Sequence, residues 1–191
     1  MKIAHTPQRA LARLVIVAAL LALAALPGRA QAQELYTFTV AGFAGVGGSI
    51  DADPGDDLGN PSLQASFAII TEPKTHLGFR LGRIDLDIDE GFGILQDAEL
   101  TYLTAAGEYR YYQSFYQSGI YLGLGAYRLE GQDFFTLRDE EETAIGAVLG
   151  LTGEFEINRY LGVVVEISGH WADLDQAQVF AMGHVGLAFH F

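Results

Sequence analysis

The feature that most constrains this chain is an alternation of apolar residues with polar or small ones, which recurs in eight successive segments. Val163, Val165 and Ile167, for example, alternate with Glu166 and Ser168. Successive side chains of a β-strand point to opposite faces, so a period of two predicts strands and not helices. The eight predicted strands lie within residues 36–40, 62–69, 76–82, 103–111, 120–127, 145–157, 161–171 and 179–191.

The connections between these segments alternate between short and long. The short ones are TEPKT, YQSFYQS and INRY, and the long, mostly acidic ones are SIDADPGDDLGNPS, DLDIDEGFGILQD, EGQDFFTLRDEEE and ADLDQAQ. An up-and-down barrel in a membrane is connected in this way, with short turns at one end and longer loops at the other. Strands of about ten residues suit a tilted crossing of a bilayer, and a closed ring leaves no unpaired strand edge in lipid.

The soluble alternative is a lipocalin-like barrel or a β-sandwich, which is also built from alternating strands. Such a domain would carry many charged residues on its outside, whereas here the face opposite the apolar one holds Gly, Thr, Ser and Ala with few charges. Aromatic residues also gather at the strand ends, as in the interfacial girdles of membrane barrels; they are Tyr36, Phe115, Tyr116, Tyr160 and Trp171. We therefore predict an all-β fold, an eight-stranded antiparallel up-and-down transmembrane β-barrel.

The first residues read as a secretory leader. Basic residues precede an apolar run from Leu14 to Leu26, and Ala30 and Ala32 then have the spacing of a signal-peptidase site. The apolar run is shorter than the roughly 20 residues of a spanning helix. We expect a cleavable signal peptide at residues 1–32 and a barrel domain at residues 33–191.

Charge excludes one class of partner. The leader holds four of the eleven basic residues and none of the twenty-four acidic ones, so seven basic and twenty-four acidic residues remain and the mature net charge is −17. Nucleic-acid binding needs clustered Lys and Arg, so we expect no nucleic-acid partner. Cysteine is absent, so no disulfide holds the fold. The sequence has no metal-binding or phosphate-loop motif, and we expect neither a metal nor another cofactor.

The C-terminal run VGLAFHF has apolar residues at alternate positions and ends on an aromatic one: Val185, Leu187, Phe189 and Phe191. Together with the eight strands, this ending resembles the small outer-membrane barrels of Gram-negative bacteria, the OmpA/OmpX-type and opacity-like proteins. The resemblance implies that the four residues form an assembly signal read by the barrel assembly machinery. It also implies a monomer in the bacterial outer membrane, surrounded by lipid and lipopolysaccharide, with periplasmic turns and extracellular loops. The larger members of the family continue into a peptidoglycan-binding domain, and we expect no such role here.

The inward face of the predicted barrel is rich in ionisable residues. We expect a polar network in the lumen formed by Arg80, Glu108, Arg110, Glu154, Glu156, Glu166 and His170, with His76, His184 and His190 on the same face. An eight-stranded interior is just wide enough for side chains to fill it, and buried charges must pair. The network is predicted to be a structural filling, with a gated conduction path for ions or small solutes as the alternative.

The residues Glu166, Ser168 and His170 raise the question of a hydrolase. Some barrels of this size modify lipid A, and deacylases among them use a Ser and a His two residues apart on one strand, facing the lipid. Here the apolar residues of the strand are expected to face the lipid, so Ser168 and His170 should face the lumen. The order is also Ser-x-His and not His-x-Ser, and Glu166 is about 13 Å from His170 along the strand. Only a register shift would turn the pair outward. We therefore predict no catalytic residue and keep a lipid A-modifying enzyme as the alternative.

The acidic loops are the remaining candidates for function. Carboxylates are concentrated at Asp51, Asp53, Asp56 and Asp57 and in the run Asp139–Glu142, without the spacing of a calcium loop. The loop residues Phe92, Phe134 and Phe135 could make adhesive contacts. The prediction is a non-enzymatic outer-membrane barrel that contributes to envelope integrity or to surface interactions through acidic external loops.

Overall fold

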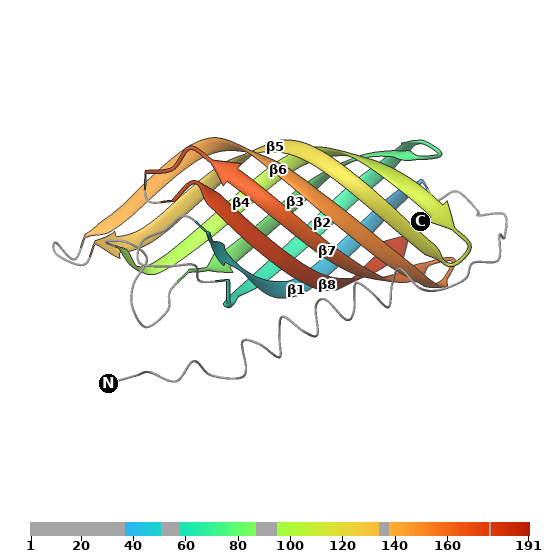
Figure 1. Cartoon of the computed structure of the whole chain (residues 1–191), viewed down its shortest axis with the longest axis horizontal. Helices are drawn as coiled ribbons and strands as arrows, with labels where there is room; N and C mark the ends of the chain where they lie inside the picture. Colours follow the sequence, from blue (N-terminus) through green and yellow to red (C-terminus); the bar gives the residue numbers. More distant parts are fainter. Residues whose placement is uncertain (1–36, 51–57, 87–94, 134–137, 176) are drawn as a thin grey trace.

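The computed structural model describes residues 37–50, 58–86, 95–133, 138–175 and 177–191, which form one closed barrel (Figure 1). Its strands are β1 Phe38–Ser49, β2 Asn60–Glu72, β3 Thr75–Asp85, β4 Leu95–Gln113, β5 Tyr116–Asp133, β6 Asp139–Asn158, β7 Leu161–Ala172 and β8 Val179–His190. The predicted leader, residues 1–32, lies outside the described residues. Within the described ranges, no helix is long and apolar enough to cross a membrane.

Every strand pairs antiparallel with its neighbour in the sequence, and β1 pairs with β8 to close the ring. In that closing pair Val40 lies opposite Phe189 and Gly45 opposite His184. The backbone hydrogen bonds of each strand are therefore satisfied on both sides, which is what a lipid environment demands. The predicted fold, an eight-stranded antiparallel barrel, is confirmed.

The outer wall of the barrel is apolar. Leu77, Phe79, Leu122, Leu124 and Ile145 point outward and are between 53 and 78 % exposed. The alternate residues of the same strands point into the lumen and are buried; His76, Arg80, Tyr121 and Val148 are examples. An exposed apolar band of this size is costly in water and stable in lipid, so the barrel is built for a membrane.

The two ends of the barrel differ as the sequence predicts. Three tight turns, at 72–75, 113–116 and 158–161, lie at the same end as the C-terminus, where Phe191 stacks on Phe38 with 4.9 Å between ring centres (Figure 1). In the β4–β5 turn Ser114 has a φ of 50°. That left-handed conformation allows a two-residue hairpin. The long connections leave from the opposite end. In outer-membrane barrels connected in this way the tight turns are periplasmic and the long connections extracellular, and we name the two ends of this barrel accordingly.

Three strands are much longer than a membrane crossing requires. β4, β5 and β6 have 19, 18 and 20 residues, against about 9–11 for a spanning strand. The prediction that residues 130–142 form a loop was wrong in this respect, because β5 continues to Asp133 and β6 begins at Asp139. Outside the membrane neither face needs to be apolar, so the charged ends of these strands lose the alternation by which strands are predicted.

Candidate functional site

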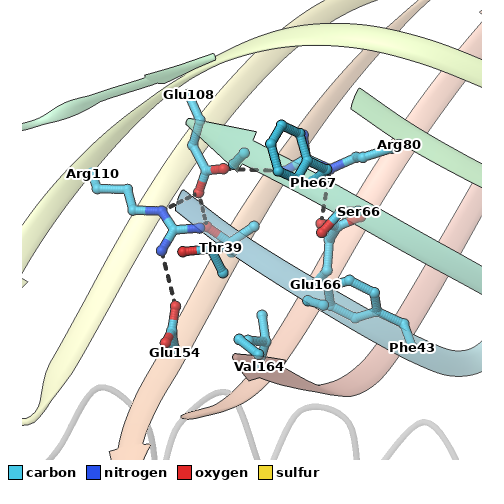
Figure 2. Close-up of a pocket in the computed structure, with 14 residues that line it drawn as sticks. Thr39, Phe43, Ser66, Phe67, Arg80, Glu108, Arg110, Glu154, Val164 and Glu166 are labelled. Atoms are coloured by element: carbon cyan, nitrogen blue, oxygen red, sulfur yellow. Dashed lines mark hydrogen bonds and ion pairs between the residues drawn. The ribbon is translucent and has the colours of Figure 1, made fainter. Parts of the chain in front are cut away.

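Five charged side chains from four strands form a chain of ion pairs across the periplasmic half of the lumen (Figure 2). Arg80 on β3 lies between Glu166 on β7 and Glu108 on β4, at 3.2 Å from each. Arg110 on β4 continues the chain, at 2.9 Å from Glu108 and 2.9 Å from Glu154 on β6. All five residues are at most 7 % exposed. The alternation of charge along the chain offsets the cost of burying each ion.

Neutral donors satisfy the remaining carboxylate oxygens of this ion-paired chain. Glu166 accepts hydrogen bonds from the Gln64 amide and the Tyr121 hydroxyl, both at 2.9 Å. Glu108 accepts one from the Thr152 hydroxyl at 2.7 Å. The guanidinium of Arg80 also lies 3.5 Å from the centre of the Tyr121 ring, a cation–π contact. These partners occupy alternate, inward-facing positions of their strands, as the charged residues do. This alternation is the sequence signal that could have identified them.

The ion-paired chain ends near the periplasmic rim. His190 Nε2 lies 2.5 Å from Glu154, and the other ring nitrogen of His190 lies 3.0 Å from the Thr39 hydroxyl. Gln117 accepts a hydrogen bond from Arg110 and donates one to Glu156. Glu156 is only half-buried and lies at a register shift of the β6–β7 pair.

The structure therefore brings together five of the seven residues predicted for the lumen network and links Glu156 to them through Gln117. His170 lies elsewhere. Its ring is 4.8 Å from the ring of Tyr102, and its Nδ1 is 2.9 Å from the Tyr127 hydroxyl. His170 faces the lumen, as predicted, but at the extracellular end.

That end of the lumen is apolar. A cluster of buried side chains, here called the apolar plug, fills it: Ile84, Leu86, Ala98, Leu100, Tyr102, Tyr127, Leu129, Ala172, Leu174, Ala177, Phe180 and Met182. The expectation of a polar lumen was therefore wrong for the extracellular half. Ile84 and Leu86 are an even number of residues from Arg80, so the alternation predicts that they face the lumen as Arg80 does. The alternation does not predict the depth of each position along the barrel axis.

The cavity beside the ion-paired chain measures about 20 Å³ and is lined by Arg80, Glu108, Arg110, Glu154 and Glu166, among others (Figure 2). This is room for about one water molecule. In the described part of the chain, the lumen is filled by an ion-paired layer and, above it, an apolar layer.

Ser168 and His170 both face the lumen and are at most 3 % exposed. Their side chains are closer than the strand spacing suggested, since His170 Nε2 lies 3.0 Å from the Ser168 hydroxyl. A nucleophile and its base have this geometry. However, the second nitrogen of His170 contacts the Tyr127 hydroxyl, where a triad would have a carboxylate. The pair is also enclosed by the apolar plug and the barrel wall, away from any lipid acyl chain.

The acidic residues predicted as a second site are partly described. Asp139, Glu140 and Glu141 are exposed on the extracellular end of β6, and Glu142 accepts hydrogen bonds from the backbone N–H of Asp175. Asp51, Asp53, Asp56 and Asp57 lie outside the described residues, as do Phe92, Phe134 and Phe135. No group of three or more His, Asp or Glu side chains in the described ranges is placed to hold a metal ion.

The sequence matches no known family profile and no curated protein. Solved structures, in contrast, match over almost their whole length. Neisserial surface protein A aligns with a TM-score of 0.67 at 13 % identity, over 81 % of this chain and 97 % of that one. Ail, the attachment invasion locus protein of Yersinia pestis, aligns with a TM-score of 0.56 at 14 % identity, over 82 % and 100 %. OprG from Pseudomonas aeruginosa aligns with a TM-score of 0.56 at 14 % identity, over 85 % and 99 %.

At such low identity these likenesses carry the fold and nothing further. The fold is that of small outer-membrane barrels, as the C-terminal pattern predicted. The apolar outer wall is the surface that such a barrel presents to lipid. The protein is a membrane-type β-barrel with the fold of the small outer-membrane barrels.

Proposed function

We propose that this protein is a non-enzymatic, monomeric barrel that presents an acidic surface outside the cell for contact with cationic partners. The observation that carries the proposal is the extension of β5 and β6 beyond the length that a membrane requires. This extension carries carboxylates on paired strands, and it supports an acidic surface outside the lipid. The filled lumen and the lipid-facing wall support a passive contribution to envelope integrity as well.

The extended sheet carries the acidic ridge, defined as Glu130, Asp139, Glu140, Glu141 and Glu142. Arg128 lies within the ridge and pairs with Glu130 and, at 2.8 Å, with Glu141. Glu142 is engaged with the backbone of the β7–β8 connection. The exposed carboxylates of Asp139 and Glu140 add further negative charge at the tip. A surface of one predominant sign attracts ligands of the opposite sign and speeds their association.

The sign of this charge separates the barrel from one of its structural neighbours. Ail was solved in complex with the heparin analogue sucrose octasulfate, a polyanion. The acidic ridge would repel such a ligand, so we expect the partner of this barrel to be basic. Sucrose octasulfate therefore serves as the negative probe in a binding test.

The test compares binding of a lysine-rich peptide to the barrel in lipid nanodiscs with binding to the double variant Asp139→Lys, Glu140→Lys. We expect the variant to bind several-fold more weakly at low salt and the difference to fade as salt is raised, because exposed charges are screened. The matched control is Glu72→Lys, which changes an exposed charge at the periplasmic end of β2. Equal binding by wild type and double variant would contradict the proposal.

The enzymatic alternative has its own readout. The Ser168–His170 hydrogen bond favours it, whereas the enclosed position and the absence of a carboxylate contact at His170 Nδ1 disfavour it. We expect lipid A from cells that produce the wild-type barrel to have the same mass distribution as lipid A from cells that produce Ser168→Ala. A lost or added acyl chain that depends on Ser168 would make this protein an enzyme.

A further inference from the structure

A groove of about 440 Å³ lies on the outer wall of the barrel, across β4, β5, β6 and β7. Its sides are formed by outward-facing aromatic and aliphatic side chains: Tyr109, Tyr111, Tyr116, Ile120, Leu151, Val165 and Ile167. Tyr109, Ile120 and Leu151 are all more than half exposed, so the groove opens toward lipid and not toward the lumen. Neither the lumen network nor the acidic ridge contributes a charged residue to it.

The strand register explains why the wall is hollow here. Tyr111 lies opposite Ser118, Ser118 opposite Gly153, and Gly153 opposite Val165. Two small residues thus occupy the middle of one outward-facing row. The next row toward the extracellular end has large side chains throughout: Tyr109, Ile120, Leu151 and Ile167. Ser118 and Gly153 form the floor between these taller neighbours, and Gly153 is buried although it points outward.

The groove lies on the outer wall near the periplasmic end of the barrel. Ser118 is two residues along β5 from Tyr116, which follows the tight β4–β5 turn, a distance of about 7 Å along the strand. Tyrosine side chains such as Tyr109, Tyr111 and Tyr116 favour this depth, where the ring is in lipid and the hydroxyl reaches the interface. Water is not stable in an apolar groove, and an empty one would forfeit the dispersion contacts of its walls. A hydrocarbon chain is the natural filling.

A cation lies at the end of the groove. The Lys74 ammonium, on the β2–β3 turn, is 6.0 Å from the centre of the Tyr111 ring. The backbone carbonyl of Lys74 accepts a hydrogen bond from the N–H of Arg110, which fixes the turn beside β4. Glu72 flanks the same turn, but Lys74 is the charge that contacts the aromatic wall. We propose that the groove holds one acyl chain of a glycerophospholipid from the periplasmic leaflet, with Lys74 paired to the lipid phosphate.

Native mass spectrometry of the detergent-purified barrel tests this proposal with two probes, phosphatidylglycerol and a diacylglycerol of the same chain lengths. We expect the wild type to retain one phosphatidylglycerol. Gly153→Leu should lower the retained fraction about ten-fold for both probes, because the new side chain takes up the volume of the acyl chain. Lys74→Gln should lower retention of phosphatidylglycerol to the level of diacylglycerol and leave diacylglycerol unchanged.

Two matched controls should bind like the wild type. Gly169→Leu adds the same side chain on β7 outside the groove, where a Cβ meets nothing within 4 Å. Arg159→Gln removes a cation from the β6–β7 turn, where Arg159 lies over Tyr160. Ser118→Leu fills the groove from β5 and replaces Gly153→Leu if that variant fails to migrate as a folded barrel in unheated gels.

Equal lipid retention by the groove-filling variants and Gly169→Leu would overturn the proposal. So would a dimer of the wild type that Gly153→Leu dissociates, since the occupant would then be a second copy.

Discussion

At the scale of single residues, Arg80 is the centre of the ion-paired chain, because it contacts both Glu108 and Glu166. Arg80→Met keeps most of the side-chain volume but leaves Glu166 with the neutral donors Gln64 and Tyr121. Removing one partner of a buried ion pair typically costs about 3–5 kcal/mol. We expect a loss of this size in the free energy of unfolding, measured by denaturant titration of the barrel in lipid vesicles.

Arg83 supplies the matched control on the same strand. It points outward and pairs with Glu99 at 3.3 Å, with side chains 51 % and 36 % exposed. An exposed pair contributes at most about 1 kcal/mol, so Arg83→Met should change the free energy of unfolding little. If the two variants lost the same stability, the ion-paired chain would not have the structural role assigned to it.

The alternation along each strand predicted that five charged side chains face the lumen, and all five are buried there: Arg80, Glu108, Arg110, Glu154 and Glu166. It could not predict which of them pair, because this depends on how neighbouring strands are staggered around the ring. The 3.0 Å contact of Ser168 and His170 depends on the rotamers of both side chains, which strand spacing alone does not determine. Strand spacing separates their backbones, and only the rotamers bring the side chains together.

At the scale of elements, β8 closes the barrel against β1. It carries three of the four residues of the predicted assembly signal on its outer face, and the fourth, Phe191, follows it directly. Val185, Leu187, Phe189 and Phe191 all point outward, with exposures of 46 to 59 %. We expect Phe191→Ser to reduce several-fold the amount of folded barrel in the outer membrane, because it interrupts the pattern that we predict to be the assembly signal. The measurement is the heat-modifiable fraction of the protein in outer-membrane preparations.

Phe79→Ser is the matched control, since Phe79 on β3 is also an outward-facing phenylalanine, 56 % exposed. The purified, denatured Phe191→Ser chain should also refold into detergent micelles, although the stack of Phe191 on Phe38 is lost. Failure of Phe79→Ser in cells to the same extent, or failure of Phe191→Ser to refold, would assign the effect to general stability and not to recognition.

The length of the strands was the least predictable property of the elements. The alternation predicted β7 at 161–171, almost as observed, because both faces of this strand are constrained, one by lipid and one by the lumen. β1 was predicted only to Val40 and continues to Ser49, because its second half consists mainly of Ala and Gly. β6 begins at Asp139 in water, where the sequence reads as an acidic loop.

At the scale of the whole molecule, the lumen is closed by two layers in series. The apolar plug fills the extracellular half, and the ion-paired chain fills the periplasmic half around a cavity of about 20 Å³. The predicted alternative of a conduction path required a continuous polar lumen. The interior of an eight-stranded ring is only wide enough for side chains, and here large residues such as Tyr102, Tyr127 and Phe180 occupy it.

We therefore expect no stepwise single-channel currents from the wild-type barrel in planar bilayers. Because the layers act in series, Phe180→Ala should stay silent, since the ion-paired layer below remains intact. Arg110→Met should stay silent as well, since the apolar plug remains and cannot stabilise a hydrated ion. Only variants that open both layers should conduct. Discrete currents in the wild type, lost when Phe180 is replaced by Trp, would show that the plug opens and that the lumen is a gated path.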